Sequence, residues 1–284
     1  MEKVGLVLEG GGMRGAYTAG VLSWLLDQGL YADYCVGISS GGMYGAFCAA
    51  DQNDLLFEGS VNIAPNPDYV GMKPILKEGQ LIAYDEIYDR KIFEAGFDPK
   101  RLVHSKTDLE IGVYSLDTYE TLWKTNEDIA NQPRWIKAAT ALPFFGKFVK
   151  INGTKYTDGG VTTMIPIRRS LEVGCKKHIV VTTKSPDYVR PPFKKLSIWL
   201  LKHVRYPFHK PMVDDFAQRT DVYYQERALV DELVQQGNCI YLYPTQETGV
   251  TRYKGSHDQF VKLFEMAKKD CERQKEALFA YLKP

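Results

Sequence analysis

Ser39 is the residue whose neighbours best suit nucleophilic chemistry. It lies in Gly37-Ile38-Ser39-Ser40-Gly41, between an expected short strand, residues 34–36, and an expected helix rich in small residues. Where a strand turns abruptly into a helix, the corner residue is strained, and the positions two before and two after it come close together. Glycines suit those positions because they lack a Cβ. The pattern therefore predicts a nucleophile elbow, with Ser39 at the corner and Gly37 and Gly41 making it sterically feasible.

A second glycine cluster, Gly10-Gly11-Gly12-Met13-Arg14-Gly15, follows an expected buried strand, residues 4–8. It satisfies G-x-G-x-x-G, the dinucleotide fingerprint, but that motif also needs an acidic residue at the end of the next strand. Asp33 instead precedes that strand, which weakens the interpretation. The other interpretation is an oxyanion site, because a glycine run lets consecutive amides point into one concavity. Gly10, Gly11 and Gly12 would then supply N–H groups, and Arg14 a cation for the oxyanion or for a substrate phosphate.

A serine nucleophile needs a base at neutral pH. Among the histidines, His257 is the best triad candidate, because it follows Gly255-Ser256 in an expected loop. Asp158 is the other candidate. It ends the second strand of a hairpin expected around Asn152-Gly153 and precedes two glycines, so it can point into a cleft while the chain turns away. Spacing alone leaves both bases open.

Buried-strand patterns at 4–8, 34–36 and 179–183 are interspersed with helical patterns, including a long amphipathic helix expected over 212–234. Such alternation favours a largely parallel sheet covered by helices. The length of 284 residues fits one large domain or two small ones.

The net charge and the spacing of the cysteines argue against several classes of protein. The net charge of +1 argues against a nucleic-acid binder that works through bulk charge. The five cysteines are scattered and lack C-x-x-C spacing, which indicates neither a disulfide framework nor a zinc site. We therefore expect no metal and a reducing, cytoplasmic location. No signal peptide and no run of about 18 apolar residues is visible.

Residues 190–210 differ from the rest of the chain because they carry six basic side chains and no acidic one, interleaved with aromatic and aliphatic residues. One interpretation is a peripheral membrane contact, with the apolar face in the lipid headgroup zone and the cations against anionic lipid. The other is a helix packed on the core with a solvated basic edge, the usual arrangement of amphipathic surface helices. The sequence leaves both interpretations open, together with a third in which this segment is a lid.

The two glycine motifs and Asp158-Gly159-Gly160, in this order, resemble the three motifs of the patatin-like phospholipase family. The stretch from Ala138 to Pro143, leading to the hairpin turn, is similar to the family's approach to its aspartate. The resemblance covers about residues 4–185 and is less distinct over 186–284. It implies a three-layer α/β/α fold, here expected as one domain over residues 1–284 with a helical C-terminal part packed on the motif-bearing part.

The resemblance also implies the mechanism. Ser39 would be the nucleophile and Asp158 its base, without a histidine, and the glycine loop would hold the oxyanion. The expected activity is hydrolysis of phospholipid or lysophospholipid esters through an acyl-enzyme, with no metal or other cofactor. The alternatives are a soluble carboxylesterase or thioesterase on small esters, a nucleotide-binding protein that uses the loop at residues 10–15, and a membrane-surface scaffold with an idle site.

Overall fold

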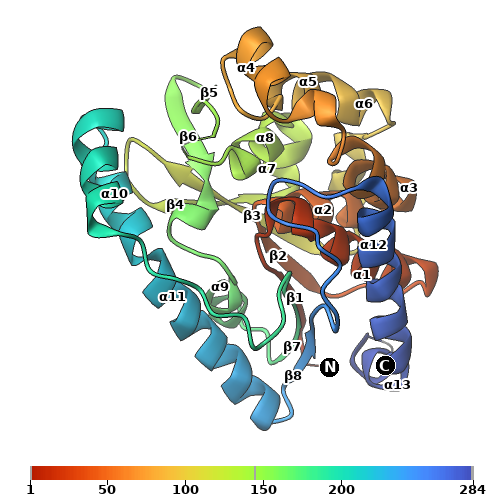
Figure 1. The fold of residues 1–284 in the computed structure, drawn as a ribbon. Coiled ribbons are helices and arrows are strands. Elements are labelled where there is room, and N and C mark those ends of the chain that lie inside the picture. Colours follow the sequence, from red (N-terminus) through yellow and green to blue (C-terminus); the bar gives the residue numbers. More distant parts are fainter. Residues whose placement is uncertain (1, 144, 283–284) are drawn as a thin grey trace.

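The computed structural model describes residues 2–143 and 145–282, and its core is a single eight-stranded sheet (Figure 1). The strand order is β5-β6-β3-β2-β1-β7-β8, with β4 also paired to β3. Strands β3, β2, β1, β7 and β8 run parallel to their neighbours in that order. The pairs β3–β4, β3–β6 and β5–β6 are antiparallel. The expected, largely parallel sheet is confirmed. The strands are β1 (Val4–Leu8), β2 (Tyr34–Ile38), β3 (Asp108–Ser115), β4 (Thr121–Thr125), β5 (Val149–Ile151), β6 (Thr154–Asp158), β7 (Lys177–Val181) and β8 (Cys239–Leu242).

Helices cover both faces of the sheet, because the strands carry apolar side chains on both faces, as β1 illustrates. Leu6 and Leu8 belong to one hydrophobic cluster and Val7 to another, as the two-residue period of a strand requires. The helices are α1 (Ala16–Asp27), α2 (Ser40–Ala49), α3 (Asn53–Phe57), α4 (Met72–Glu78), α5 (Tyr84–Glu86), α6 (Ile92–Glu94), α7 (Asn126–Asn131), α8 (Arg134–Thr140), α9 (Ile167–Glu172), α10 (Lys195–Leu200), α11 (Lys210–Gln235), α12 (His257–Arg273) and α13 (Lys275–Leu282).

The larger cluster joins one sheet face to α1, α2, α8 and α12, and the smaller one joins the other face to α11 and to the start of α9. This is the expected three-layer arrangement, and the sheet lies between α11 and α12 in Figure 1. The C-terminal region takes part directly, because β8 extends the sheet and α12 packs on α1. Gly20 of α1 is needed at that contact, since a Cβ there would lie 2.3 Å from the carbonyl oxygen of Phe264.

The β5–β6 hairpin forms where the Asn152-Gly153 pair predicts it. Both residues have positive φ, 51° and 92°, the left-handed conformation that two-residue hairpin turns require. Strand β6 then runs antiparallel to β3 and ends at Asp158, opposite Val113. The hairpin therefore delivers Asp158 to the region where β2 ends.

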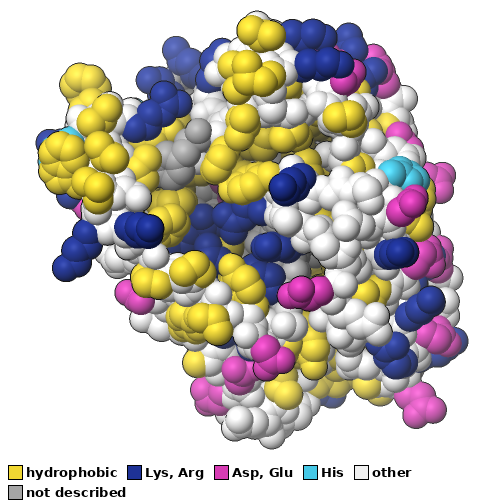
Figure 2. Space-filling model, viewed as in Figure 1, with side chains coloured by type: hydrophobic (Ala, Val, Ile, Leu, Met, Phe, Trp, Pro, Cys, Tyr) yellow, Lys and Arg dark blue, Asp and Glu magenta, His cyan; other side chains and the backbone are white. Residues whose placement is uncertain are grey.

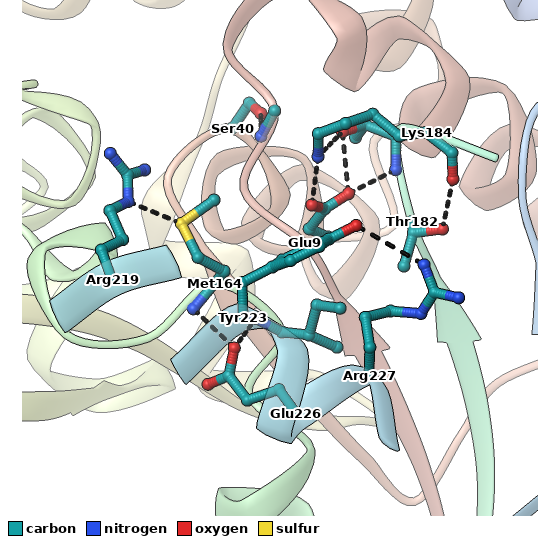
Figure 3. A network of polar contacts seen from close by, with 12 residues as sticks. Glu9, Ser40, Met164, Thr182, Lys184, Arg219, Tyr223, Glu226 and Arg227 are labelled. Carbon is teal, nitrogen blue, oxygen red and sulfur yellow. Dashed lines mark hydrogen bonds and ion pairs between the residues drawn. The ribbon is translucent and has the colours of Figure 1, made fainter. Parts of the chain in front are cut away.

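A buried ion pair fixes the carboxyl ends of β1 and β7 beside the glycine loop (Figure 3). Glu9, the first residue after β1, is fully buried. Its carboxylate accepts hydrogen bonds from the Thr183 N–H at 2.6 Å, from the Thr183 hydroxyl at 2.8 Å and from the Lys184 ammonium. Burial alone would raise the pKa of Glu9, but Lys184 and these hydrogen bonds outweigh it and hold the pKa below its ordinary value. Glu9 is therefore ionised, and it anchors the residue that immediately precedes Gly10.

We predict that Glu9→Gln destabilises the fold by about 3–5 kcal/mol, because it leaves the Lys184 ammonium buried without a carboxylate. The double variant Glu9→Gln/Lys184→Met should recover most of that loss. The free energy of unfolding from urea denaturation measures both effects. The control is Glu2→Gln in the exposed Lys177–Glu2 pair, where a change below about 1 kcal/mol is expected. Equal midpoints for Glu9→Gln and Glu2→Gln would contradict the prediction.

Candidate active site

Ser39 occupies the junction of β2 and α2, as the G-x-S-x-G pattern predicts. Strand β2 ends at Ile38, α2 begins at Ser40, and the backbone of Ser39 has φ 55° and ψ −128°. A non-glycine residue in this region stores conformational strain, which persists only where the surroundings enforce it. Ser39 lies at the carboxyl end of the parallel strands, where ligands bind in open α/β sheets.

The two elbow glycines are required by close backbone approach. A Cβ on Gly37 would lie 2.5 Å from the Gly42 nitrogen and 2.6 Å from the Gly41 carbonyl carbon. A Cβ on Gly41 would lie 2.7 Å from the carbonyl oxygens of both Leu8 and Glu9. The first contact closes the corner on itself. The second presses the corner against the end of β1, so that the elbow and the glycine loop are packed as one unit.

Asp158 lies next to Ser39 and is almost completely buried. Its Oδ1 accepts a 2.7 Å hydrogen bond from the Gly160 N–H, which caps the short helical turn Gly159–Val161. Burial raises the pKa of Asp158 above its ordinary value, although hydrogen bonding by the Ser39 side chain and by Gly160 opposes the rise, as do the charges of Arg219 and Arg252. Oδ2 makes no hydrogen bond of standard geometry to the described residues. The carboxylate therefore has one oxygen held in place and one free to accept a proton from the neighbouring hydroxyl.

In the glycine loop, two of the three predicted oxyanion donors have partners of their own. The Gly10 N–H donates to the Met164 carbonyl at 3.2 Å, and the Gly11 N–H donates to the Ser40 hydroxyl at 3.1 Å. Gly12 has φ 59°, and its N–H makes no hydrogen bond within residues 2–143 and 145–282. The structure thus leaves Gly12 as the loop amide that is open to a ligand. Gly10 is needed for another reason, because a Cβ there would lie 3.0 Å from the Cβ of Ser39.

Met164 connects the loop, the aspartate turn and α11 (Figure 3). Its carbonyl accepts from Gly10, and its sulfur accepts a 2.8 Å hydrogen bond from Nε of Arg219. The buried carboxylate of Glu226 accepts from the N–H groups of Met164 and Ile165, at 3.0 and 2.8 Å. Burial raises the pKa of Glu226 to about 8. Two side chains of α11 therefore hold the segment that follows Asp158.

Ser39 opens into a largely apolar cavity. Its walls come from α2, from the π-helical turn Glu58–Ile63, from the segment between α4 and α6, and from the loop before α12. Aliphatic and aromatic side chains line most of it: Met13, Met43, Phe47, Ile63, Ile82, Ile87 and Ile92, with Tyr84, Tyr88 and Tyr253. Such a lining suits a hydrocarbon chain that ends at the Ser39 hydroxyl.

No histidine lines this cavity within the described part of the chain. His257, the triad candidate from sequence, is exposed at the start of α12, where its Nε2 lies 3.3 Å from Oδ1 of Asn62. Arg14 lies partly exposed in the short helix Gly12–Gly15 and is not among the cavity-lining residues. Asp33 lies at the opposite end of the sheet and accepts a 2.7 Å hydrogen bond from the Val4 N–H, so it is far from the glycine loop, as the sequence indicates.

Three residues near the site lie outside the motifs found in the sequence. Glu9 acts through partners more than 170 positions away. Arg252 lines the cavity from the loop before α12, where its carbonyl accepts from the Met13 N–H at 3.1 Å. Arg219 does have a signal in the sequence, because it falls on the buried face of α11 between Phe216 and Tyr223. A charged residue on the apolar face of an amphipathic helix indicates a buried polar contact.

Residues 190–210 pack on the core with only part of their apolar side chains, because Ile198, Leu201 and Tyr206 contact a hydrophobic cluster that includes Met212 and Phe216. The side chains of Leu196, Trp199, Val204 and Phe208 are all more than half exposed. None of the helices within residues 2–143 and 145–282 combines the length and apolar character needed to span a bilayer. The same residues contain no cluster of three or more His, Cys, Asp or Glu side chains suited to a metal ion.

Comparison with known proteins supports the fold. The chain is 26% identical over 208 residues to the uncharacterized protein YjjU of Escherichia coli strain K12, an alignment that covers 70% of this chain and 57% of YjjU. The chain thus spans little more than half the length of this relative. The crystal structure of VipD from Legionella pneumophila superimposes with a TM-score of 0.52 at 14% identity, covering 98% of this chain and 67% of VipD. That likeness shows the shared fold.

Two sequence families match separate parts of the chain. Residues 209–283 match a domain of unknown function, DUF6363. Residues 6–170, more than half of the chain, match the patatin-like phospholipase family, and they include both glycine motifs and Asp158. The chain therefore belongs to the patatin-like phospholipase family.

Proposed function

We propose that this protein hydrolyses carboxylic esters of lipids through a Ser39–Asp158 dyad. The observation that carries the proposal is Ser39, whose backbone is strained and whose hydroxyl faces a buried carboxylate at the end of an apolar cavity. Membership of a phospholipase family supports lipid esters as the substrate class. A soluble carboxylesterase that acts on small esters is the alternative, and turnover of short-chain nitrophenyl esters without turnover of phospholipid would favour it.

In the first half-reaction, the Ser39 oxygen attacks the ester carbonyl carbon while its proton passes to Oδ2 of Asp158. The carbonyl oxygen becomes an oxyanion, which would accept a hydrogen bond from the N–H of Gly12. The N–H of Gly11 can donate a second hydrogen bond to the oxyanion only after the Ser40 hydroxyl, its present acceptor, turns away. The intermediate then collapses, the C–O bond to the alcohol breaks, and the leaving alkoxide takes the proton back from Asp158. The products are the free alcohol and an acyl-Ser39 ester.

In the second half-reaction, Asp158 takes a proton from water as the water oxygen attacks the acyl carbon. Collapse of this intermediate breaks the bond to Ser39, which recovers its proton, and releases the carboxylic acid. Burial of Asp158 supports this role, because desolvation raises the basicity of a carboxylate.

We further propose that the apolar prominences beside the site rest on an anionic lipid surface. Figure 2 shows hydrophobic side chains gathered over α10 and over α4, with a hollow between them. On α4, Met72 and Leu76 are exposed, as are Leu196 and Trp199 on α10. The absence of acidic residues from 190–210 favours anionic lipid as the partner of the α10 prominence.

We predict that Ser39→Ala and Asp158→Asn each lower ester hydrolysis by at least about a thousandfold, because each removes a group that the reaction requires. An alkyl fluorophosphonate should label Ser39, as located by mass spectrometry. His257→Ala is the matched control and should retain most of the activity on a long-chain lysophospholipid. Loss of activity in His257→Ala, together with an active Asp158→Asn variant, would refute the dyad.

We predict that kcat/KM on a soluble ester falls as the pH drops through a value above about 3.9, the ordinary pKa of aspartate. Only ionised Asp158 can accept the proton, and burial raises its pKa. Tyr84 and Tyr88 also face this carboxylate, but burial raises their own pKa values and keeps them neutral.

Arg219→Gln should shift the fall of kcat/KM at low pH, the acid limb of the pH profile, to still higher pH. The reason is that the substitution removes a cation that opposes protonation of Asp158. Arg134→Gln, at the exposed start of α8, is the control and should leave the limb in place. A limb at the ordinary aspartate pKa, unmoved by Arg219→Gln, would show that Asp158 is not the base.

We predict that Leu196→Ser/Trp199→Ser weakens binding to phosphatidylglycerol vesicles roughly tenfold or more, because the apolar area available to enter the lipid is removed. Vesicle co-sedimentation measures the binding. Val103→Ser/Leu171→Ser removes exposed apolar side chains from other elements and should leave vesicle binding unchanged. Equal binding by both double variants would contradict a lipid contact through α10.

A further inference from the structure

Three arginines from distant parts of the chain lie close to one another, and two of them, Arg219 and Arg252, lie near Asp158. Arg190 follows β7, Arg219 lies in the middle of α11, and Arg252 lies in the loop before α12. Arg190 and Arg219 are only 7% and 4% exposed. Figure 2 shows Lys and Arg side chains on the floor of the hollow between the α10 and α11 side of the molecule and the loop before α12. We call these three residues the arginine cluster.

Two members of the cluster are located by direct contacts with the site. A Cβ on Gly160 would lie 3.3 Å from Nη2 of Arg219 and 2.9 Å from Oδ1 of Asp158, so this guanidinium lies beside the aspartate turn. Nε of Arg219 is occupied by Met164, whereas its two terminal nitrogens have no hydrogen bond to the described residues. The Arg252 side chain packs against Gly12 and lines the cavity that contains Ser39.

The third member, Arg190, is fixed from α11. Its N–H donates to the Tyr224 hydroxyl at 2.9 Å, and its guanidinium carbon lies 5.3 Å from the centre of the Tyr223 ring. The three positive charges lie close enough to influence one another. Burial lowers the pKa of Arg219 to about 9, and the neighbouring charges of Arg252 and Arg190 add to this effect.

The cluster lacks compensating negative charge. Within the described residues none of the three guanidinium groups forms a salt bridge, in contrast to Arg169, which pairs with Glu110, and Lys184, which pairs with Glu9. Two carboxylates lie near the cluster: Glu9 acts on Arg190 but is already paired with Lys184, and Asp158 acts on Arg219. Two buried guanidinium groups beside a third, partly exposed one are costly unless an anion compensates their charge. The contacts of Arg190 with Tyr223 and of Arg219 with Phe216 compensate only part of that cost, since a cation–π contact contributes roughly 0.5–2 kcal/mol.

The position and chemistry of the arginine cluster indicate which kind of anion would bind there. Arginine presents a planar fork of donors that matches phosphate oxygens in pairs. Arg252 lies at the edge of the apolar cavity, whereas Arg190 and Arg219 are not part of its lining. A ligand that places a hydrocarbon chain in the cavity and its ester at Ser39 therefore extends its remaining portion toward the cluster.

We propose that the arginine cluster binds a phosphate group carried by the lipid ester substrate, while the acyl chain occupies the apolar cavity. This assignment rests on the proposed hydrolase function and narrows its substrate class to esters with a phosphate on the alcohol side. The phosphate would supply the negative charge that the cluster lacks, and it would orient the ester over Ser39.

Calorimetric titration with non-hydrolysable probes tests the site without relying on catalysis. Octyl phosphate should bind at least roughly tenfold more tightly than 1-octanol or inorganic phosphate, because it fills both the cavity and the cluster. Arg190→Gln should remove that preference, and Arg190→Lys, which keeps the charge but loses the fork, should reduce it. Arg134→Gln, the same change at an exposed site, should leave it intact.

Three outcomes would overturn the assignment. Equal affinity for octyl phosphate and 1-octanol would show that no phosphate site exists. Equal affinity for octyl phosphate and inorganic phosphate would assign the cluster to a free anion. A preference that persists in both Arg190 variants, with circular dichroism showing that they are folded, would place the phosphate elsewhere.

A kinetic comparison separates this inference from the proposed function. The wild-type protein should hydrolyse a monoacylglycerol phosphate with a higher kcat/KM than the neutral monoacylglycerol of the same chain length. Turnover of both esters at equal efficiency would refute the phosphate site and leave the hydrolase proposal standing. Turnover of neither, with Arg190-dependent binding of octyl phosphate, would refute the hydrolase proposal and leave the phosphate site standing.

Discussion

The candidate site depends on one steric constraint, the close backbone approach at the corner between β2 and α2. Gly37 and Gly41 allow the chain to close that corner, and Gly41 also lets it press against the end of β1. This packing enforces the unfavourable φ of Ser39 and brings Gly10 against its side chain. Because the same contacts set the elbow and the loop, Ser39 and the amide of Gly12 are positioned together rather than separately.

Buried polar groups extend this constraint to the rest of the molecule. Glu9 ties the end of β1 to β7 through Lys184, and Glu226 ties the segment after Asp158 to α11. Both carboxylates are buried, but their surroundings act in opposite directions: the pKa of Glu9 is held low by a cation, and that of Glu226 is raised to about 8 by burial. A buried carboxylate that lacks part of its hydrogen bonds destabilises the fold. One whose hydrogen bonds are all made favours a single arrangement of the segments it connects.

The sequence predicts the parts of the site that are encoded locally. The elbow at Ser39 follows from glycines two positions away, and the hairpin that delivers Asp158 follows from Asn152-Gly153. The largely parallel sheet follows from short apolar runs. The structure confirms the geometry of all three, and the catalytic roles of Ser39 and Asp158 remain proposals.

The remaining features depend on contacts between distant segments and could not be read from local patterns. The hydrogen bonds of Gly10 and Gly11 are made with residues far along the chain, so the sequence could not show that Gly12 alone stays open. The arginine cluster draws on three segments that only the fold brings together. For residues 190–210, amphipathicity predicts a helix in either interpretation, and exposure of the apolar side chains is a tertiary property.

The loop that carries Arg252 and Tyr253 has a consequence for how such proteins evolve. It belongs to the part of the chain that matches DUF6363, yet it lines the same cavity as Ser39, which belongs to the part that matches the patatin-like family. The two sequence regions are therefore not interchangeable modules. A gene fusion that joined this N-terminal part to an unrelated C-terminal partner would keep Ser39 but would lack the part of the cavity wall that Arg252 and Tyr253 form.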